Sequence, residues 1–167
     1  MGVSGSGKST IAALLAGRLA WEYADADEFH TPANIAKMHG GTPLTDEDRQ
    51  PWLENMAAWI QATAAIGRHG VLACSALKRD YRRTLAGAHQ VAASGATDTV
   101  RLIYLRGDKA LITRRQAARH NHFMPATLVD SQFATLEEPG PEEHPLTVSI
   151  AAKPHAIVDH IITSLAA

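Results

Sequence analysis

The first ten residues carry the clearest chemical signal in the sequence. Residues 2–9 read GVSGSGKS, which matches the phosphate-binding pattern G-x-x-x-x-G-K-[ST] of a P-loop. Glycines let the backbone curl so that its N–H groups form a nest for an anion at a helix N-terminus. In this pattern Lys8 reaches the β- and γ-phosphates of a nucleotide, and the Ser9 hydroxyl binds Mg²⁺. The predicted ATP or GTP contacts are Gly2, Val3, Ser4, Gly5, Ser6, Gly7, Lys8, Ser9 and Thr10.

The start of the sequence leads to an expectation about the first strand. A P-loop normally follows a buried strand in the middle of a parallel sheet, whereas only Met1 precedes Gly2 here. Roughly five buried apolar side chains, at about 1.5–3 kcal/mol each, would equal the whole net stability of a domain, about 5–15 kcal/mol. We therefore expect that Met1 is an internal methionine and that the first strand is truncated.

Two carboxylates follow the first predicted helix, in the sequence Asp25-Ala26-Asp27. In an extended segment both carboxylates would point to the same side of the chain. A P-loop kinase needs one acid to hold a Mg²⁺-bound water and another to orient or deprotonate the acceptor hydroxyl. The alternative is a solvated acidic turn, and the P-loop upstream favours the functional interpretation.

Several cationic side chains are candidates for binding an anionic substrate. Arg49 could grip a carboxylate or phosphate with two parallel hydrogen bonds, although most pairs such as Asp48-Arg49 are surface salt bridges. Lys78 follows a predicted buried strand and could meet an anionic substrate, whereas Arg82 and Arg83 are expected in solvent.

Arg115 and Arg119 lie one turn apart on one face of a predicted helix. Like charges at this spacing cost about 0.2–0.5 kcal/mol in an isolated helix. A bound triphosphate would offset this cost if the helix belongs to a closing lid. The alternative is a basic face in solvent.

Length and composition limit the class of protein. The chain has 167 residues, of which 46% are hydrophobic, and this predicts one domain with its own core. A net charge of −1 with interspersed signs argues against a nucleic-acid or membrane surface. One cysteine, Cys74, permits no intramolecular disulfide and is expected in the core. With no signal peptide or apolar run of about 20 residues, we expect a cytoplasmic protein.

Hydrophobic periodicity and turn residues predict the elements that position these groups. Helices are expected over about 9–22, from 46 to beyond 63, and over 77–89, 108–120, 126–136 and 154–165; strands are expected over 71–75, 100–105 and 146–150. Strands that alternate with helices indicate a parallel α/β sheet covered on both faces, with ligands beyond the carboxyl ends of the strands. Trp52 and Trp59 are expected in the core.

With these residues assembled, the sequence resembles the gluconokinase family of small P-loop kinases, relatives of shikimate kinase and the nucleoside-monophosphate kinases. The motifs that carry the resemblance are the P-loop, Asp25-x-Asp27-x-x-His30, Asn34-Ile35-Ala36-Lys37-Met38, Gly41-Thr42-Pro43-Leu44, Asp46-x-Asp48-Arg49-x-Pro51-Trp52-Leu53, Cys74-Ser75-Ala76-Leu77-Lys78-x-x-Tyr81-Arg82, Tyr104-Leu105-x-Gly107-Asp108, Arg115-x-x-x-Arg119-x-x-His122-Phe123-Met124-Pro125 and Ser131-Gln132-Phe133-x-x-Leu136-Glu137-x-Pro139. Each motif alone is weak, and their number and order carry the resemblance. Ala26 departs from the family pattern, in which glycine usually separates the two aspartates.

The resemblance implies an α/β fold with a nucleoside-monophosphate-kinase-like parallel sheet of strand order 2-3-1-4-5, flanked by helices. It implies a single P-loop kinase domain over residues 1–167, with a substrate-binding segment at about 27–60 and a mobile lid at about 109–128. The implied reaction transfers the γ-phosphate of ATP to the 6-hydroxyl of D-gluconate, with Mg²⁺, in a homodimer.

The roles of individual residues follow from these motifs. The expected catalytic residues are Lys8, Asp27, Arg115 and Arg119, with both arginines also on the ATP. The expected sugar-acid pocket consists of Asp27, His30, Arg49 and Lys78. Ser9 is expected to bind Mg²⁺ and Asp25 to support it through water, while Asp27 orients and deprotonates the acceptor hydroxyl. The loop after Glu137 is a candidate neighbour of adenine.

Two other functions remain open from the sequence. The first is another small-molecule kinase, acting on shikimate or a nucleotide monophosphate, which gluconate-stimulated ADP release would distinguish. The second is an ATP-binding module without turnover. The paired aspartates and the lid arginines argue against such a module, because binding alone needs neither.

Overall fold

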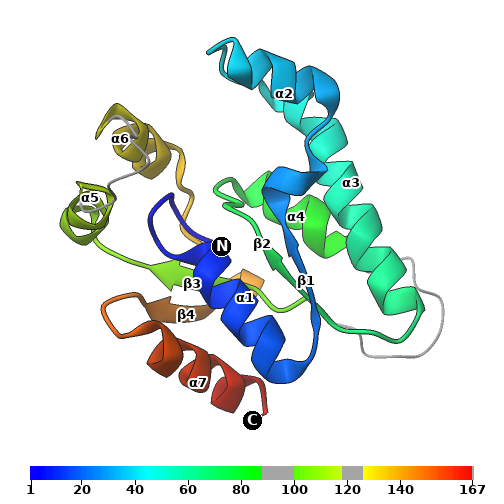
Figure 1. Ribbon diagram of the computed structural model, residues 1–167, viewed down its shortest axis with the longest axis vertical. Helices are drawn as coiled ribbons and strands as arrows, with labels where there is room; N and C mark the ends of the chain where they lie inside the picture. The colour runs from blue at the N-terminus through cyan, green and yellow to red at the C-terminus, as the bar shows by residue number, and fades with distance from the viewer. Residues whose placement is uncertain (88–99, 118–125, 167) are drawn as a thin grey trace.

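The computed structural model describes residues 1–87, 100–117 and 126–166 (Figure 1). The helices are α1 (Lys8–Leu19), α2 (Pro32–His39), α3 (Asp46–Ala65), α4 (Arg79–Gly87), α5 (Lys109–Ala117), α6 (Ala126–Thr135) and α7 (Pro154–Leu165), with 3₁₀ turns η1 (Ala26–Phe29) and η2 (Pro141–Glu143). The strands are β1 (Glu22–Asp25), β2 (Gly70–Ala73), β3 (Ile103–Arg106) and β4 (Leu146–Ser149). None of the helices in these ranges has the length and apolar character needed to cross a membrane.

The strands form two parallel pairs flanked by helices. β1 pairs with β2, with Glu22 opposite Gly70, and β3 pairs with β4, with Ile103 opposite Leu146. One hydrophobic cluster includes residues of α1, β3, β4 and α7, and a second joins α3 to α4 and to the end of β2. The expected parallel α/β architecture is therefore present, and Figure 1 shows α1 running between the two strand pairs.

The backbone of Met1 and Gly2 lies between the two strand pairs. The Met1 amine donates to the Ile103 carbonyl at 2.5 Å, and the Met1 carbonyl accepts from the Leu105 N–H at 3.0 Å. On the other side, the Gly2 N–H donates to the Ser75 carbonyl at 3.2 Å. A cavity of about 810 Å³ adjoins Met1 and is lined by side chains of α1, α3, β2 and β3. The P-loop thus begins at the carboxyl ends of β2 and β3.

The helix α2 has no counterpart among the predicted elements. The Thr31 hydroxyl accepts from the Asn34 N–H at 3.2 Å, and Pro32 occupies the first helical position. Both are recognised signals of a helix start. The helix is mostly exposed, so its sequence lacks a strong apolar stripe; it is anchored by the Asn34 amide, which donates to the Asp48 carbonyl at 2.8 Å.

Several predicted boundaries differ from those of the structure. The first helix ends at Leu19, because Ala20 adopts a left-handed conformation with φ 53° and β1 begins at Glu22. The strand predicted over 100–105 is β3, at Ile103–Arg106. By contrast, the predicted last helix coincides with α7.

Arg82 is buried, contrary to the sequence-based expectation. Its side chain is 3% exposed and makes two hydrogen bonds to the Glu143 carboxylate, at 2.6 and 2.9 Å. Its Nη1 donates to the carbonyls of Ala76 and Leu77 at 3.0 and 3.1 Å. A buried guanidinium needs such pairing, and its partner lies on the distant turn η2. The neighbouring Arg83 is 71% exposed, as expected.

Candidate functional site

The P-loop forms a glycine-rich turn at the N-terminus of α1. Gly5 has φ 84°, and Gly7, the residue that caps α1, has φ 90°. These angles lie in the left-handed region that glycine adopts without strain. A Cβ at Gly5 would also lie 3.1 Å from the side-chain amide of Gln116. The loop therefore has the backbone geometry of an anion nest at a helix N-terminus.

Lys8 and Ser9 extend the P-loop toward the end of β1. Lys8 Nζ donates to the Val3 carbonyl at 3.0 Å, so the ammonium lies against the loop. Ser9 Oγ donates to Asp25 Oδ2 at 2.7 Å, and the Tyr23 hydroxyl donates to the same oxygen at 3.2 Å. The structure thus brings together the two residues predicted for Mg²⁺. Hydroxyl and carboxylate oxygens beside a phosphate nest fit this hard cation.

Asp25, predicted to support Mg²⁺ through water, and Asp27, the predicted base, do not share one extended segment. β1 ends at Asp25, and the chain turns at once into η1, which contains Asp27. Asp25 Oδ1 accepts from the Asp27 N–H at 3.2 Å and so caps this turn. The side chain of Asp27 is exposed. The extended segment on which the same-side arrangement of the two carboxylates depends is therefore absent at Asp27, and the turn sets their relative placement.

His30 follows η1 and stacks on Trp52. The ring centroids lie 5.1 Å apart and the planes differ by 7°. Trp52 is 6% exposed, as expected for a core residue, and its Nε1 donates to the Ala26 carbonyl at 2.6 Å. The Nδ1 of His30 is buried, and no residue within the described ranges hydrogen-bonds to it.

The electrostatic environment of His30 favours the neutral imidazole. Burial lowers its pKa from the ordinary 6.5, while the Asp27 carboxylate raises it and the Arg49 guanidinium lowers it. The charges of Asp27 and Arg49 thus act on the His30 imidazole in opposite directions. Because the pKa in the folded state lies below the value in the unfolded chain, neutral His30 contributes stability above about pH 6.5, and this stability is lost as the pH falls through the folded-state pKa.

We expect an NMR titration of the His30 ring protons to give a pKa below 6.5. Asp27→Asn should lower this pKa further, because a favourable negative charge is lost, and Arg49→Ala should raise it. Glu28→Gln is the matched control, since it removes a carboxylate from the same turn and should have a smaller effect. A wild-type pKa at or above 6.5 would show that the imidazole is not desolvated.

Arg49 and Lys78 converge with Tyr81 on one carboxylate, and we call these three residues the donor cluster. Lys78 Nζ lies 2.5 Å from Asp46 Oδ2 and 5.5 Å from the centre of the Tyr81 ring. Arg49 Nη1 lies 3.5 Å from Asp46 Oδ1 and from the Tyr81 hydroxyl, which also donates to Asp46 Oδ1. Hydrogen bonds from Lys78 and Tyr81 lower the pKa of Asp46, and the bond to Asp46 raises that of Lys78.

Asp48 fixes the start of α3 and thereby the position of Arg49. Its N–H donates to the Thr45 hydroxyl at 3.2 Å, and its Oδ2 accepts from the Thr45 N–H at 2.7 Å, forming a capping box. Lys37 Nζ reaches the same oxygen at 2.5 Å, and this contact is the main reason that the pKa of Asp48 falls to about 2. Asp48 thus caps the helix, whereas Arg49 belongs to the donor cluster.

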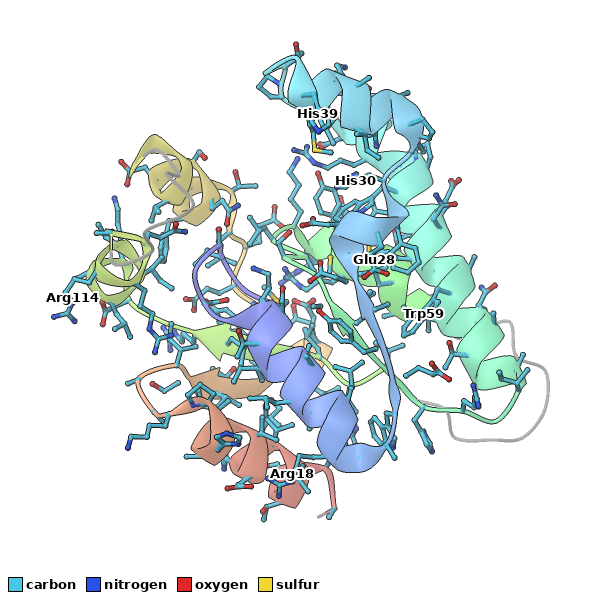
Figure 2. All side chains as sticks on the ribbon, viewed as in Figure 1. Arg18, Glu28, His30, His39, Trp59 and Arg114 are labelled. Atoms are coloured by element: carbon cyan, nitrogen blue, oxygen red, sulfur yellow. The ribbon has the colours of Figure 1, made fainter. Side chains whose placement is uncertain are left out.

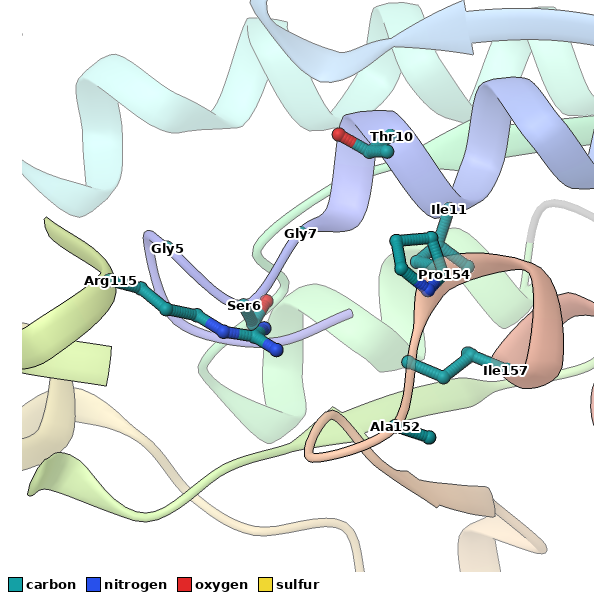
Figure 3. A pocket seen from close by; sticks show the side chains of 9 residues that line it. All are labelled: Gly5, Ser6, Gly7, Thr10, Ile11, Arg115, Ala152, Pro154 and Ile157. Carbon is teal, nitrogen blue, oxygen red and sulfur yellow. The ribbon is translucent and has the colours of Figure 1, made fainter. Parts of the chain in front are cut away.

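Arg115 lies beside the P-loop, at a cavity of about 250 Å³ (Figure 3). Its Nη2 donates to the Ile150 carbonyl at 2.6 Å. The cavity is lined by Gly5, Ser6, Gly7, Thr10, Ile11, Arg115, Ala152, Pro154 and Ile157. Arg114 instead points outward from α5 (Figure 2). Arg119 lies outside the described residues, so its predicted place beside Arg115 has no counterpart here.

The loop after Glu137 does not line the cavity beside the P-loop. The Glu137 N–H donates to the Leu77 carbonyl at 2.9 Å, and its Oε2 accepts from the Arg79 N–H at 2.6 Å. This loop therefore packs against the start of α4. Ala152, between β4 and α7, and Pro154, the first residue of α7, line that cavity instead. The place of the loop after Glu137 beside adenine stays a prediction.

Two glutamines that the sequence pattern does not indicate contact Ser4 of the P-loop. Gln116 Nε2 donates to Ser4 Oγ at 3.2 Å, and the Ser4 N–H donates to Gln132 Oε1 at 2.5 Å. They come from α5 and α6, respectively. Gln132 belongs to a motif of the resemblance, but nothing in its spacing indicates this contact, and Gln116 carries no signal.

Comparison with known proteins gives consistent matches. A family model described as an AAA domain matches residues 1–139. A gluconokinase of Gluconobacter oxydans is 41% identical over 162 residues, covering 97% of this chain and 86% of the relative. An unliganded sugar kinase of Janibacter sp. HTCC2649 is 43% identical with a TM-score of 0.86, covering 99% of this chain and 91% of that one. A gluconokinase of Sinorhizobium meliloti 1021 is 37% identical with a TM-score of 0.81, covering 99% and 89%.

Proposed function

The chain belongs to the gluconokinase family, and we propose that it transfers the γ-phosphate of ATP to the 6-hydroxyl of D-gluconate. The fold is that of an α/β P-loop kinase, and such kinases bind ATP. In the geometry, the observation that carries the proposal is the donor cluster, in which two cations and a hydroxyl converge on a carboxylate. A neutral polyol has no group that requires these charges, whereas a sugar acid does.

The nucleotide binds with its phosphates on the P-loop amides and Lys8, while Arg115 and Arg119 neutralise charge on the triphosphate. The position of Arg115 beside Gly5 and Gly7 supports this role. Ser9, and Asp25 through water, would hold Mg²⁺, which would neutralise charge on the phosphate oxygens. The contact between Ser9 Oγ and Asp25 Oδ2 supports their joint role.

The sugar acid binds with its carboxylate on the Arg49 and Lys78 side and its hydroxyls toward His30 and Asp27. Asp27 accepts the proton of the 6-hydroxyl while that oxygen forms its bond to the γ-phosphorus. The bond from this phosphorus to the β,γ-bridging oxygen breaks, and the electron pair leaves with ADP. The products are 6-phosphogluconate and ADP.

The finer architecture belongs to the same proposal. The order 2-3-1-4-5 counts the strand that leads into the P-loop as the first, so β1, β2, β3 and β4 are its strands 2, 3, 4 and 5. This order puts the first strand between β2 and β3, and the hydrogen bonds of Met1 and Gly2 to both sides support it. Residues 109–128 act as a lid and 27–60 as the substrate-binding segment of one domain. The enzyme acts as a homodimer.

Coupled ADP release with Mg-ATP tests the proposed function. D-gluconate should stimulate turnover, whereas shikimate, AMP and glucose should not. Lys8→Met provides the control for contaminating kinases, because loss of the P-loop ammonium should abolish the signal. Turnover with shikimate or AMP would identify a different small-molecule kinase. ATP binding without turnover on any acceptor would favour the binding module.

A further inference from the structure

The donor cluster already holds a carboxylate, and it belongs to the chain itself. Asp46, the first residue of α3, presents Oδ2 to Lys78 and Oδ1 to Tyr81 and Arg49. Three donors from two separate segments thus meet at one anionic side chain. A receptor with this arrangement can bind any carboxylate that reaches it with suitable geometry.

Asp46 does not satisfy the three donors equally. It lies 2.5 Å from Lys78 Nζ but 3.5 Å from Arg49 Nη1, which is the outer limit of a hydrogen bond. Asp46 and Arg49 both belong to the first turn of α3, and the helix backbone restricts how closely their side chains can approach each other. A free carboxylate has no such tether, so it can bring its two oxygens nearer to Arg49 and Lys78 together.

The contact with Asp46 is also easy to reverse. The side chain of Asp46 is 55% exposed, and those of Arg49 and Lys78 are each 33% exposed. Ion pairs with this exposure contribute little, because water solvates the separated charges well. The single hydroxyl hydrogen of Tyr81 serves one acceptor at a time. A second carboxylate at this hydroxyl therefore has to replace the first.

We propose that Asp46 occupies the binding site of the substrate carboxylate, and that the carboxylate of D-gluconate displaces Asp46 when the acid binds. This inference rests on the proposed function. The apparent affinity for the acid then equals the intrinsic affinity multiplied by the fraction of molecules in which Asp46 has left this binding site. It also adds selectivity, since an acceptor without a carboxylate leaves the cluster closed on Asp46.

Asp46→Asn in the full chain tests the inference. The amide keeps the shape of the side chain but loses the charge that competes for the two cations. We expect KM for D-gluconate to fall by about two- to fivefold, with kcat and KM for ATP unchanged. Asp46→Glu, which restores the carboxylate, should keep KM near the wild-type value. Glu47→Gln is the matched control, because it removes one charge from the same helical turn outside these contacts.

Arg49→Ala and Lys78→Ala, measured in parallel, separate this inference from the proposed function. Each should raise KM for D-gluconate about tenfold or more, and far more than KM for ATP. If gluconate gives no turnover with the wild-type chain, the proposed function fails. If gluconate is turned over but Arg49→Ala and Lys78→Ala leave its KM unchanged, the donor cluster does not bind the substrate carboxylate. The inference then fails while gluconate kinase activity stands.

The Asp46 variants can overturn the inference on their own. A higher KM for D-gluconate in Asp46→Asn would mean that Asp46 orients Lys78 for the substrate and does not compete with it. An equal fall of KM in Asp46→Asn and Glu47→Gln would mean that net charge, and no specific displacement, sets the affinity. A fall confined to Asp46→Asn supports displacement.

Discussion

Asp27→Asn should lower kcat by about 10²- to 10⁴-fold, which is the usual contribution of a general base. Asparagine has the same size but cannot take the proton of the acceptor hydroxyl. The Asp27 backbone N–H, which donates to Asp25, remains in place, so η1 should keep its conformation. We therefore expect the Kd for Mg-ATP to stay unchanged. Steady-state ADP release and an ATP titration measure the two quantities.

Glu28→Gln provides the comparison for Asp27→Asn, because the next residue of η1 is also an exposed acid. It should retain nearly full turnover. Near-normal kcat in Asp27→Asn would remove Asp27 from the role of base. Loss of ATP affinity in the same variant would instead mean that the substitution disturbs Ser9 and Asp25 at the proposed Mg²⁺ site.

Arg82→Met should lower the free energy of unfolding by about 3–5 kcal/mol, because a largely buried carboxylate loses both guanidinium hydrogen bonds and, among the described residues, keeps only the Gly140 N–H and the more distant Arg79, at 3.8 Å. The side chain of Arg82 is 3% exposed and that of Glu143 is 15% exposed. The change also removes the donor to the carbonyls of Ala76 and Leu77. Urea unfolding monitored by circular dichroism measures the loss.

Two comparison variants make the Arg82 result specific. Arg83→Met changes the next residue, which is 71% exposed, and should shift stability by only about 0.5 kcal/mol or less. The double change Arg82→Met with Glu143→Gln should recover part of the loss, because it also removes the largely buried negative charge that Arg82 neutralised. If Arg82→Met costs no more than Arg83→Met, the pair contributes nothing measurable to stability.

The same pair makes stability depend on pH. Arg82 is the main reason that the pKa of Glu143 lies below its ordinary value of 4.5. A carboxyl group with a lowered pKa in the folded state stabilises the fold above about pH 4.5, and this stability is lost as the pH falls through the folded-state pKa. Arg82→Met should therefore weaken the loss of stability between neutral and acid pH.

The sequence by itself determined the P-loop and several element boundaries. The loop motif lies within one turn and the start of one helix, so the spacing of Gly7, Lys8 and Ser9 already specifies the local geometry. Aspartate is a favoured helix cap, and Asp108 directly precedes α5, where its Oδ1 accepts from the Leu111 N–H at 2.7 Å. Such features depend on backbone groups within a few residues, which is why local patterns predict them.

Only the tertiary structure decided which distant side chains meet. Asp46 and Lys78 are 32 residues apart in the chain, Arg82 and Glu143 are 61 apart, and Ser4 and Gln132 are 128 apart. A lone arginine or aspartate in a sequence is most often a solvated surface residue, whereas Arg82 is buried. Its burial, like the contact of Asp46 with the donor cluster, exists only once α3, α4 and the turn η2 have packed together, because long-range contacts are set by how the elements pack and not by local spacing.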